Sequence, residues 1–548
     1  MRQAKRPAVD KEQDVAVSSR IWPWVVIIVV VIAAAVIRGR LLSVPLERDE
    51  GEYAYIAQQM LQGVQPYVSA YSMKLPGIYV VYAAIMAVFG QTHTAIHLGL
   101  LIFNSATIFV IFLLAKKIFG PIAGVMAGGV YAVISMTAEV NGLWANAEHF
   151  VVLPVLAGLL LICKAGDKIG YVRLLIAGLL FGLAFITKQH GIFFPVFGAL
   201  YLLYSGLRDR PIKWIKAIVA QIVFAAGAVT PFVLVCFYFW RNGTFDKFWF
   251  WTLTYAREYT TSLTLSDAWR IFNERIPPLA EESFFSYLFA AAGLLAVVIV
   301  RRYRPGAVFA IGLLVFSFLA VCPGFYFRGH YFILIMPAVA ILAGAAISAI
   351  DVLFQRIMPV ISRVFIIGAT GLGVVGYTLH QQRAYLFDNT PEAVCRMVYG
   401  GNPFPESLRI AEFIRNNTGP NDTVAVVGSE PQIYFYSGRR SATSYIYMYP
   451  LMETTQFARD MQWEMIAQIE AANPKFLVSV NIKTSWLVKP SSDKEIFKWS
   501  DSYCSQFYDL VGAVSIMPLG QTVYRWNEQA ANYRPVSEHW VAVFKRRH

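Results

Sequence analysis

A cluster of acidic residues follows the first long apolar stretch of the chain, which runs from Ile21 to Ile37. Asp49, Glu50 and Glu52 lie close together a few positions beyond its end. Carboxylates beside a membrane span are costly unless they are hydrated, paired or functional. A carboxylate within hydrogen-bond reach of a hydroxyl can accept its proton as a general base. The simpler explanation is a solvated loop with acidic residues at a helix N-terminus.

Basic and polar residues occur at several other turns that the sequence assigns to the same side of the membrane. Lys74 directly precedes Leu75-Pro76-Gly77, where it either snorkels to the interface or binds an anion. The remaining polar positions fall at three further turns: Asn141, Asn146, Glu148 and His149; Thr187, Lys188, Gln189 and His190; and Arg328, His330 and Tyr331. Together they supply fixed cations and carboxylates at one membrane face, which an anionic substrate requires.

The composition is that of a membrane protein with one soluble part. Of the 548 residues, 57% are hydrophobic and 15% are charged, whereas soluble proteins carry roughly 25% charged residues. The long apolar runs lie between residues 21 and 380, and residues 381–548 have ordinary globular composition. The net charge of +13 comes from short basic clusters between apolar runs. This distribution encodes membrane topology and argues against nucleic acid as a partner.

About eleven apolar segments are long enough to be transmembrane helices. They cover residues 21–42, 93–115, 121–138, 149–163, 171–187, 191–207, 214–240, 284–300, 305–322, 331–350 and 359–380. With residues 1–20 as a cytoplasmic tail, every second connection is basic, as the positive-inside rule requires. The basic residues concerned are Arg2, Lys5, Arg6 and Lys11; Lys116 and Lys117; Lys164 and Lys168; Arg208, Arg210, Lys213 and Lys216; Arg301, Arg302 and Arg304; and Arg356 and Arg363.

The apolar segment at residues 77–90 is too short for a span. As a span it would also place every later basic cluster outside. We therefore predict an interfacial or re-entrant helix, within one large outer loop at residues 43–92. An odd number of spans then places residues 381–548 outside the cytoplasm, and residues 21–380 form a multi-span domain in the plasma or inner membrane.

Residues 381–548 are predicted to fold as an α/β domain. Helices are expected at 405–417 and 452–472, and strands at 423–428, 476–480, 511–517 and 539–544. No nucleophile or phosphate-loop motif occurs there, so the domain either recognises an acceptor, covers the site or caps the fold. Cys395 and Cys504 would be able to pair in an oxidising compartment.

The order of these motifs resembles that of a known family. Asp49-Glu50-x-x-Tyr53 followed by Lys74-Leu75-Pro76-Gly77 resembles the GT-C superfamily, whose members take a sugar from a polyprenyl-phosphate carrier. Protein O-mannosyltransferases and the lipid A aminoarabinose transferase are relatives. The similarity continues through Asn146-Ala147-Glu148, Thr187-Lys188, His330-Tyr331 and the segment 428–440. Two positions depart from the family pattern: Leu75 replaces a proline, and His149 stands where a proline often follows the glutamate.

The resemblance implies an inverting glycosyltransferase with the GT-C fold and Asp49 as general base. Glu50 would orient Asp49 or tune its pKa, because adjacent carboxylates raise each other's pKa. The other roles are binding of the donor phosphate (Lys74, Lys188, Arg328 and His330) and binding of substrate (Tyr53, Glu148 and Tyr331). Oligosaccharyltransferase relatives use a divalent metal, whereas the mannosyl and aminoarabinosyl relatives do not. Lysines stand where a metal would be needed, so we expect neither metal nor cofactor.

Two other classes of protein fit part of the pattern. A transporter would also place charges in its membrane domain, but it should show internal repeats and broken helices at mid-membrane. A lipid-carrier-binding protein with an outer sensory domain would need the cations but not the paired carboxylates. The identity of the sugar stays open, as does the acceptor, which is a lipid, a glycan or a protein.

Overall fold

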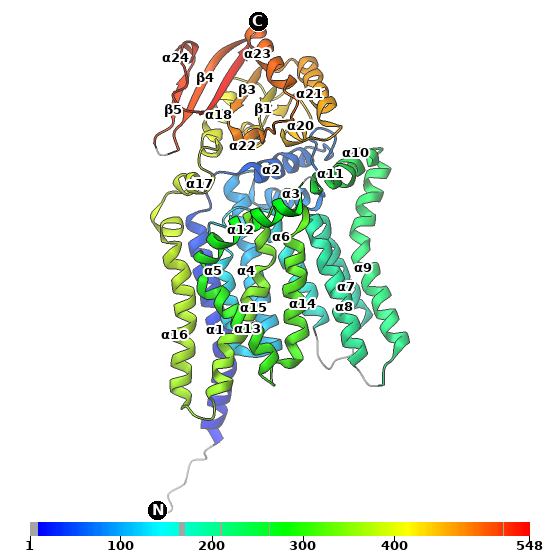
Figure 1. The fold of residues 1–548 in the computed structure, drawn as a ribbon, viewed down its shortest axis with the longest axis vertical. Coiled ribbons are helices and arrows are strands. Elements are labelled where there is room, and N and C mark those ends of the chain that lie inside the picture. Colours follow the sequence, from blue (N-terminus) through cyan, green and yellow to red (C-terminus); the bar gives the residue numbers. More distant parts are fainter. Residues whose placement is uncertain (1–8, 164–169, 209–210, 262, 519, 548) are drawn as a thin grey trace, which may run out of the picture.

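The computed structural model describes residues 9–163, 170–208, 211–261, 263–518 and 520–547. Residues 1–8 of the predicted cytoplasmic tail therefore lie outside the described residues. The same holds for several basic residues that support the predicted topology, namely Arg2, Lys5, Arg6, Lys164, Lys168 and Arg210. Figure 1 shows two parts: a long helical bundle that ends at the N-terminus, and a smaller α/β domain at the opposite end.

The bilayer core contains no water, so a membrane-spanning segment must satisfy its own backbone hydrogen bonds. A single apolar segment therefore crosses the bilayer as a helix. Seven helical stretches among the described residues are long and apolar enough to do so. They are contained in α1 (Val9–Arg40), α4 (His93–Phe119), η1 with α8 (Gln189–Ile192 and Phe193–Arg208), α9 (Trp214–Arg241), α14 (Arg304–Val321), α15 (Met336–Phe354) and α16 (Val360–Gln381). An eighth results if α12 (Leu265–Glu282) and α13 (Phe284–Ile299), which meet at a bend of 101°, are counted as one span.

Three shorter apolar helices complete the bundle and account for the remaining predicted spans. They are α5 (Pro121–Ile134), α6 (Ala147–Ile162) and α7 (Tyr171–Thr187). Each of the eleven predicted segments thus coincides with a helix, and the fold class is confirmed. One boundary differs. The segment predicted as a span from residue 331 begins as a helix at Met336, because residues Gly329–Leu334 form the 3₁₀ helix η4.

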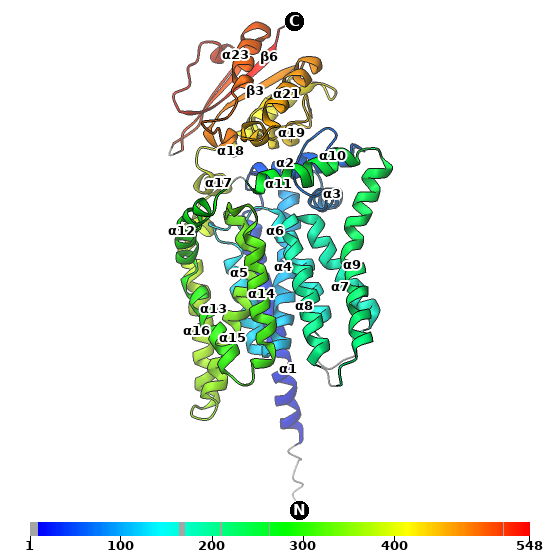
Figure 2. The same cartoon turned by 45° about the vertical axis from the view of Figure 1, so that its right-hand side comes forward.

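Short elements cross the end of the bundle that faces the α/β domain and lie between the two parts (Figures 1 and 2). The helix α2 (Arg48–Leu61) packs on α3 (Gly77–Phe89), which is the segment predicted to be interfacial rather than spanning. The others are α10 (Phe245–Trp249), the π-helical turn η2 (Phe250–Tyr255), α11 (Ala256–Thr260), the 3₁₀ turn η3 (Pro323–Phe325) and η5 (Ala384–Asp388).

The α/β domain is built on one six-stranded sheet in the order β2-β1-β3-β6-β4-β5. The strands are β1 (Thr423–Val427), β2 (Arg440–Ser441), β3 (Phe476–Asn481), β4 (Tyr508–Ile516), β5 (Val523–Trp526) and β6 (His539–Arg546). β1 pairs in parallel with β2 and β3, and the other pairs are antiparallel. All four predicted strands are present. The two that the sequence analysis missed, β2 and β5, are edge strands of two and four residues.

Eight helices accompany this sheet. They are α17 (Pro391–Tyr399), α18 (Phe404–Asn416), α19 (Gln432–Ser437), α20 (Tyr449–Met452), α21 (Ala458–Ala472), α22 (Lys483–Trp486), α23 (Glu495–Phe507) and α24 (Glu528–Ala531). The helix predicted at 452–472 begins only at Ala458, because the polar run after Met452 separates α21 from the short helix α20. Cys395 and Cys504 are buried and unpaired, so the disulfide considered above does not form in this structure.

One hydrophobic cluster contains residues of both parts of the molecule. Buried side chains of α2 and α3 lie in the same cluster as those of β1, β3 and α19. The Arg48 guanidinium at the start of α2 reaches into the domain. It forms an ion pair of 2.9 Å with Glu430 and donates to the Ser429 carbonyl at 2.6 Å. This docking places residues of the domain against the end of the bundle that carries α2.

Candidate active site

The first turn of α2 holds Asp49 at the end of the bundle that faces the α/β domain. Glu47 is the N-cap, and its carboxylate accepts the N–H groups of Asp49 and Glu50, each at 3.0 Å. The Glu50 carboxylate accepts the N–H of Glu47 in return, which completes a capping box. Two of the acidic residues therefore fix the start of the helix, while the Asp49 side chain is left to face a cavity.

Glu50 lies on the opposite side of α2 from that cavity. Its side chain is fully buried and accepts the backbone N–H of Ala145, and His97 Nε2 lies 2.9 Å from Oε1. These contacts tie α2 to α4 and to the turn before α6. The predicted catalytic pair is therefore divided, and Glu50 is a positioning residue that holds the helix carrying Asp49.

Lys74 bridges two carboxylates of α2. Its Nζ lies 3.0 Å from Asp49 Oδ1 and forms a second ion pair with Glu52. Asp49 and Glu52 are one helical turn apart and share a face of α2, whereas Glu50 does not. The ammonium also lies 4.8 Å from the ring centre of Tyr53. Tyr53 is thus buried beneath Lys74 rather than lining the cavity that Asp49 faces.

The α/β domain contributes to this cluster through Tyr447. Its hydroxyl donates to Asp49 Oδ1 at 2.9 Å, and its ring lies beside the Lys74 ammonium. The sequence analysis did not identify Tyr447 or Glu52 as site residues. The alternating tyrosines of the segment 445–449 are a signal that an aromatic surface occurs there, but nothing local connects them with Asp49.

These neighbours keep Asp49 ionised. Burial alone raises the pKa of Asp49, but Lys74, His330 and Arg328 outweigh it and hold the pKa well below its usual range. For Glu52, burial prevails over the attraction of Lys74, and its pKa lies above the usual value. The site therefore contains a carboxylate that is unprotonated at neutral pH, as a general base must be before it takes up a proton.

A second pair of opposite charges lies next to the first. Lys188, just after α7, forms an ion pair with the fully buried carboxylate of Glu148 at the start of α6. His330 Nε2 is 3.8 Å from the same carboxylate, and the Lys188 ammonium lies 4.5 Å from the ring centre of Tyr331. Glu148, predicted to bind substrate, lies behind Lys188 and lines neither of the two cavities described below.

Arg328 is held by aromatic residues of two neighbouring segments. Its guanidinium donates to the Tyr259 hydroxyl at 3.2 Å and stacks over Tyr326 at 5.5 Å. Tyr259 comes from α11 and Tyr326 from the turn after η3. Negatively polarised phenol oxygens and rings raise the pKa of Arg328, so it is a permanent cation at the site.

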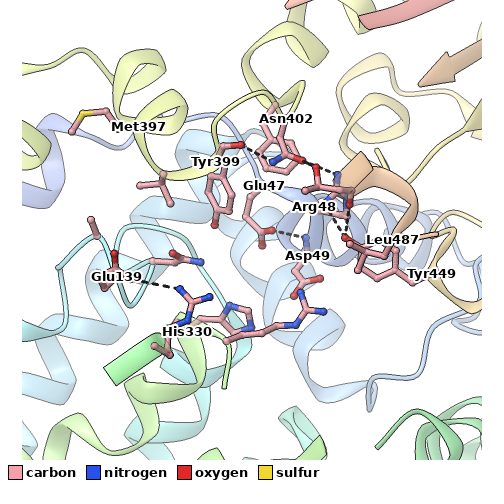
Figure 3. A pocket seen from close by; sticks show the side chains of 18 of the residues that line it. Glu47, Arg48, Asp49, Glu139, His330, Met397, Tyr399, Asn402, Tyr449 and Leu487 are labelled. Atoms are coloured by element: carbon pink, nitrogen blue, oxygen red, sulfur yellow. Dashed lines mark hydrogen bonds and ion pairs between the residues drawn. The ribbon is translucent and has the colours of Figure 1, made fainter. Parts of the chain in front are cut away.

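Two cavities meet at Asp49. The larger, of about 510 Å³, lies toward α17 and contains Glu47, Glu139 and Asn402 in its wall, as Figure 3 shows in part. The smaller, of about 70 Å³, lies toward α11 and is lined by both lysines of the site and by several aromatic residues. Five residues line both cavities: Asp49, Arg328, His330, Tyr447 and Tyr449.

The carboxylates of the site are engaged by lysines. Asp49 and Glu52 contact Lys74, and Glu148 contacts Lys188. Across the described ranges, no group of three or more His, Cys, Asp or Glu side chains has the arrangement of a metal site. A divalent ion would have to displace a lysine to reach two of these carboxylates.

Comparisons with known proteins show which family and which solved structures the chain resembles. Residues 74–256 match the sequence model of the family described as dolichyl-phosphate-mannose-protein mannosyltransferase. In solved structures, ArnT from Cupriavidus metallidurans, bound to undecaprenyl phosphate, aligns with a TM-score of 0.60 at 16% identity, over 95% of this chain and 98% of that one. The chain has the GT-C fold. The predicted resemblance to this superfamily is confirmed.

A second GT-C structure is similar as well. The archaeal oligosaccharyltransferase AglB from Archaeoglobus fulgidus, in complex with an inhibitory peptide and a dolichol-phosphate, aligns with a TM-score of 0.51. The identity is 12%, over 93% of this chain and 75% of that one. A search of curated protein sequences returns no match. The GT-C fold thus extends over the bundle and the α/β domain together.

Proposed function

We propose that the chain is an inverting glycosyltransferase that moves a sugar from a polyprenyl phosphate to an acceptor hydroxyl, with Asp49 as general base. One observation carries this proposal. An ionised carboxylate lies at the junction of two cavities, and both lysines of the site line only the smaller of the two. That arrangement separates a place for the leaving phosphate from a place for the acceptor.

The donor phosphate belongs in the smaller cavity. Lys74, Lys188 and Arg328 line it, and His330 adds a hydrogen-bonding group. Fixed cations stabilise the charge that develops on a departing phosphate. The aromatic residues Trp251 and Tyr331 line the same cavity, and aromatic faces suit the apolar side of a sugar ring.

An apolar path for the carrier lies close to these cations. A cavity of about 290 Å³ occurs between α7, α8 and α9, and it is lined by apolar side chains. Phe185 and Ile192, on either side of Lys188 in the sequence, contribute to its wall. The headgroup of the carrier would bind at Lys188 while part of its chain occupies this cavity. The two similar structures are complexes with undecaprenyl phosphate and with a dolichol-phosphate, which supports such a donor.

The chemical step follows from the position of Asp49. The acceptor hydroxyl oxygen attacks the anomeric carbon from the larger cavity and forms the new C–O bond. Asp49 takes up the hydroxyl proton as attack proceeds. The bond from the anomeric carbon to the phosphate oxygen breaks, and the phosphate keeps the bonding electrons. Attack and departure occur on opposite sides of that carbon, so the configuration inverts.

The reaction would proceed without a metal ion. Two lysines and one arginine supply the positive charge near the phosphate, and the carboxylates that would bind a metal already form ion pairs. Glu52 and Glu148 then act by positioning Lys74 and Lys188. Tyr53 supports Lys74 from below through its ring.

We place the site on the extracytoplasmic side of a plasma or inner membrane. The α/β domain and α2, which carries Asp49, lie at one end of the bundle, and the start of α1 lies at the other (Figure 2). Lys116 and Lys117 in the last turn of α4, and Arg304 at the start of α14, belong to the connections that the sequence assigns to the cytoplasm.

A deletion strain of the host tests this function. Without the chain, the polyprenyl-phosphate sugar that it consumes should accumulate, and mass spectrometry of lipid extracts would identify the sugar. Wild-type protein should remove the accumulated donor, whereas Asp49→Asn at equal membrane abundance should not. Equal removal by both proteins would show that Asp49 is not the base. Absence of any accumulation would favour a carrier-binding protein without turnover.

A further inference from the structure

The wall of the smaller cavity contains a phenol whose hydroxyl is not used by the protein. Among the described residues that line this cavity, Tyr255 alone has a buried polar side-chain atom without a hydrogen-bond partner. Tyr255 is only 1% exposed. Buried hydroxyls in native proteins almost always have a partner, and each exception calls for an explanation. Beside a cavity proposed to hold a substrate, the explanation that we favour is a polar group of that substrate.

Five other tyrosines of the same cavity use their hydroxyls within the protein. The Tyr259 hydroxyl accepts from Arg328 at 3.2 Å. The other four donate to a carboxylate or a carbonyl at 2.7–3.0 Å: Tyr71 and Tyr445 to Glu464, Tyr447 to Asp49, and Tyr449 to Thr484. These hydroxyls hold the wall of the cavity together. Tyr255 differs from them, so its hydroxyl is not needed to build the wall.

Tyr255 is the last residue of the π-helical turn η2. Such turns are rare and occur frequently at functional sites. Trp251, Tyr255 and Tyr259 follow one another at intervals of four and all line the smaller cavity. The ring centres of Trp251 and Tyr255 are 5.3 Å apart. The segment from η2 to α11 therefore forms an aromatic wall with one hydroxyl that is free to bind another group.

The electrostatic surroundings of Tyr255 favour an uncharged partner. Burial and the negative charge of Glu453 raise the pKa of Tyr255 above its usual value, so the phenol keeps its proton. A neutral hydroxyl both donates and accepts a hydrogen bond. The Lys188 ammonium lies instead 4.5 Å from the ring centre of Tyr331. The phosphate of a donor therefore belongs with the cations, and Tyr255 with an uncharged polar part of the same donor.

We propose that Tyr255 hydrogen-bonds one hydroxyl of the donor sugar and thereby determines which sugar is transferred. The inference rests on the proposed glycosyl transfer and names a specificity-determining residue for it. With the phosphate held by Lys74, Lys188 and Arg328, the sugar ring is joined to it through a single oxygen and lies against the aromatic wall. A pocket that hydrogen-bonds a substrate hydroxyl rejects the analogue without it, because its own buried polar group is then unpaired.

Two variants of one helical face provide a matched test. Tyr255→Phe removes only the unpartnered hydroxyl, whereas Tyr259→Phe makes the same change where the hydroxyl contacts Arg328. The donors are the sugar identified in the deletion strain, attached to undecaprenyl phosphate, and each of its monodeoxy forms. Purified full-length protein is added to membranes of the deletion strain, which supply the acceptor, and kcat/KM is measured for each donor. Binding of undecaprenyl phosphate without sugar is measured by native mass spectrometry, and stability by thermal unfolding.

The wild type should discriminate against one monodeoxy donor by about 10- to 100-fold, the range expected when a buried hydroxyl loses its partner. Tyr255→Phe should transfer the complete sugar more slowly by a similar factor and should no longer discriminate against that donor. Tyr259→Phe should slow all donors alike and keep the discrimination, because its hydroxyl acts on the cation. Tyr255→Phe should bind undecaprenyl phosphate as the wild type does and be at least as stable.

Three results would overturn the role of Tyr255 but not the transferase. They are the same preference among monodeoxy donors in Tyr255→Phe and wild type, weaker binding of undecaprenyl phosphate by Tyr255→Phe, and a lower thermal stability of that variant. The second would assign the hydroxyl to the phosphate, and the third would show that it has a partner within the protein. Absence of transfer by the wild type from every one of these donors would overturn the proposed function as well.

Discussion

The contact between α2 and the α/β domain depends on Gly51, and a single added methyl group should disturb the site through it. A Cβ on Gly51 would lie 2.6 Å from the backbone N of Gln432 and 2.8 Å from its Cβ. Ordinary contacts of a Cβ lie at 3.4–4 Å. The nearest atom belongs to the backbone at the start of α19, so it cannot rotate away. Gly51→Ala therefore forces α2 and the domain apart.

The size of the effect follows from these distances. Restoring an ordinary contact requires a displacement of about 1 Å, and such overpacking costs about 1–3 kcal/mol of stability. The displacement acts on the docking of the domain that carries Tyr447, whose hydroxyl donates to Asp49 at 2.9 Å. Misplacement of reacting groups by about 1 Å lowers a rate by about 10²-fold. We expect Gly51→Ala to lose activity by one to two orders of magnitude while still folding.

The assay is transfer from the identified donor in membranes, together with thermal unfolding of the purified full-length protein. Gly373→Ala is the control, since a Cβ at that position meets no atom within 4 Å. It should retain activity and be as stable as the wild type or more so, because alanine favours a helix. If Gly51→Ala has wild-type turnover and stability, the α/β domain is not an integral part of the site.

Further predictions concern the two lysines of the site, the pKa of Asp49 and the proposed absence of a metal ion. Lys188→Met should destabilise the protein by about 3–5 kcal/mol, since it leaves Glu148 buried without its partner, and Glu148→Gln in addition should recover part of that loss in thermal unfolding. Lys74→Met removes the largest influence that lowers the pKa of Asp49, so the acid limb of the pH profile of kcat/KM should move to higher pH. In the wild type, this depressed pKa contributes stability above the unfolded-state value of about 3.9, and that stability is lost as pH falls through the folded-state pKa. EDTA should leave transfer unchanged, and a loss that Mn²⁺ or Mg²⁺ restores would contradict the proposed chemistry.

Much of the membrane domain could be predicted because its determinants are local. The length of an apolar run and the position of basic residues are visible without a structure, and all eleven predicted segments are helices. The boundary at Met336 could not be predicted in this way. Residues Gly329–Leu334 are apolar enough for a span, but they form a 3₁₀ turn that presents Arg328, His330 and Tyr331 to the site.

The residues of the site could be predicted better than the contacts between their side chains. Asp49 and Lys74 do meet, but the second carboxylate on Lys74 is Glu52 rather than Glu50. Helical periodicity explains the difference, since residues three apart share a face and adjacent residues do not. A helix that contains both Asp49 and Glu52 places their side chains on one face, so predicting a helix over this segment would have selected Glu52. Glu50 faces the bundle and fixes α2 to His97.

The contribution of the α/β domain lay beyond sequence reasoning. Tyr447 and Asp49 are separated by 398 positions, and they meet because the domain docks on α2 through a shared hydrophobic cluster and the ion pair of Arg48 with Glu430. No local pattern specifies which surface of a domain will pack on which helix. Three roles were left open for the domain: recognising an acceptor, covering the site or capping the fold. In the structure, the domain contacts Asp49 directly through Tyr447, so its role includes contact with the site.

The central claim is that Asp49 accepts the proton of an acceptor hydroxyl during glycosyl transfer. The most direct measurement is the single-turnover rate of purified wild type and Asp49→Asn, with donor bound to both proteins and equal thermal stability established. General-base catalysis typically contributes about 10²–10⁴-fold, so the single-turnover rate of Asp49→Asn should be at least about 10²-fold lower. Equal single-turnover rates in the two proteins would contradict the assignment of Asp49 as the base.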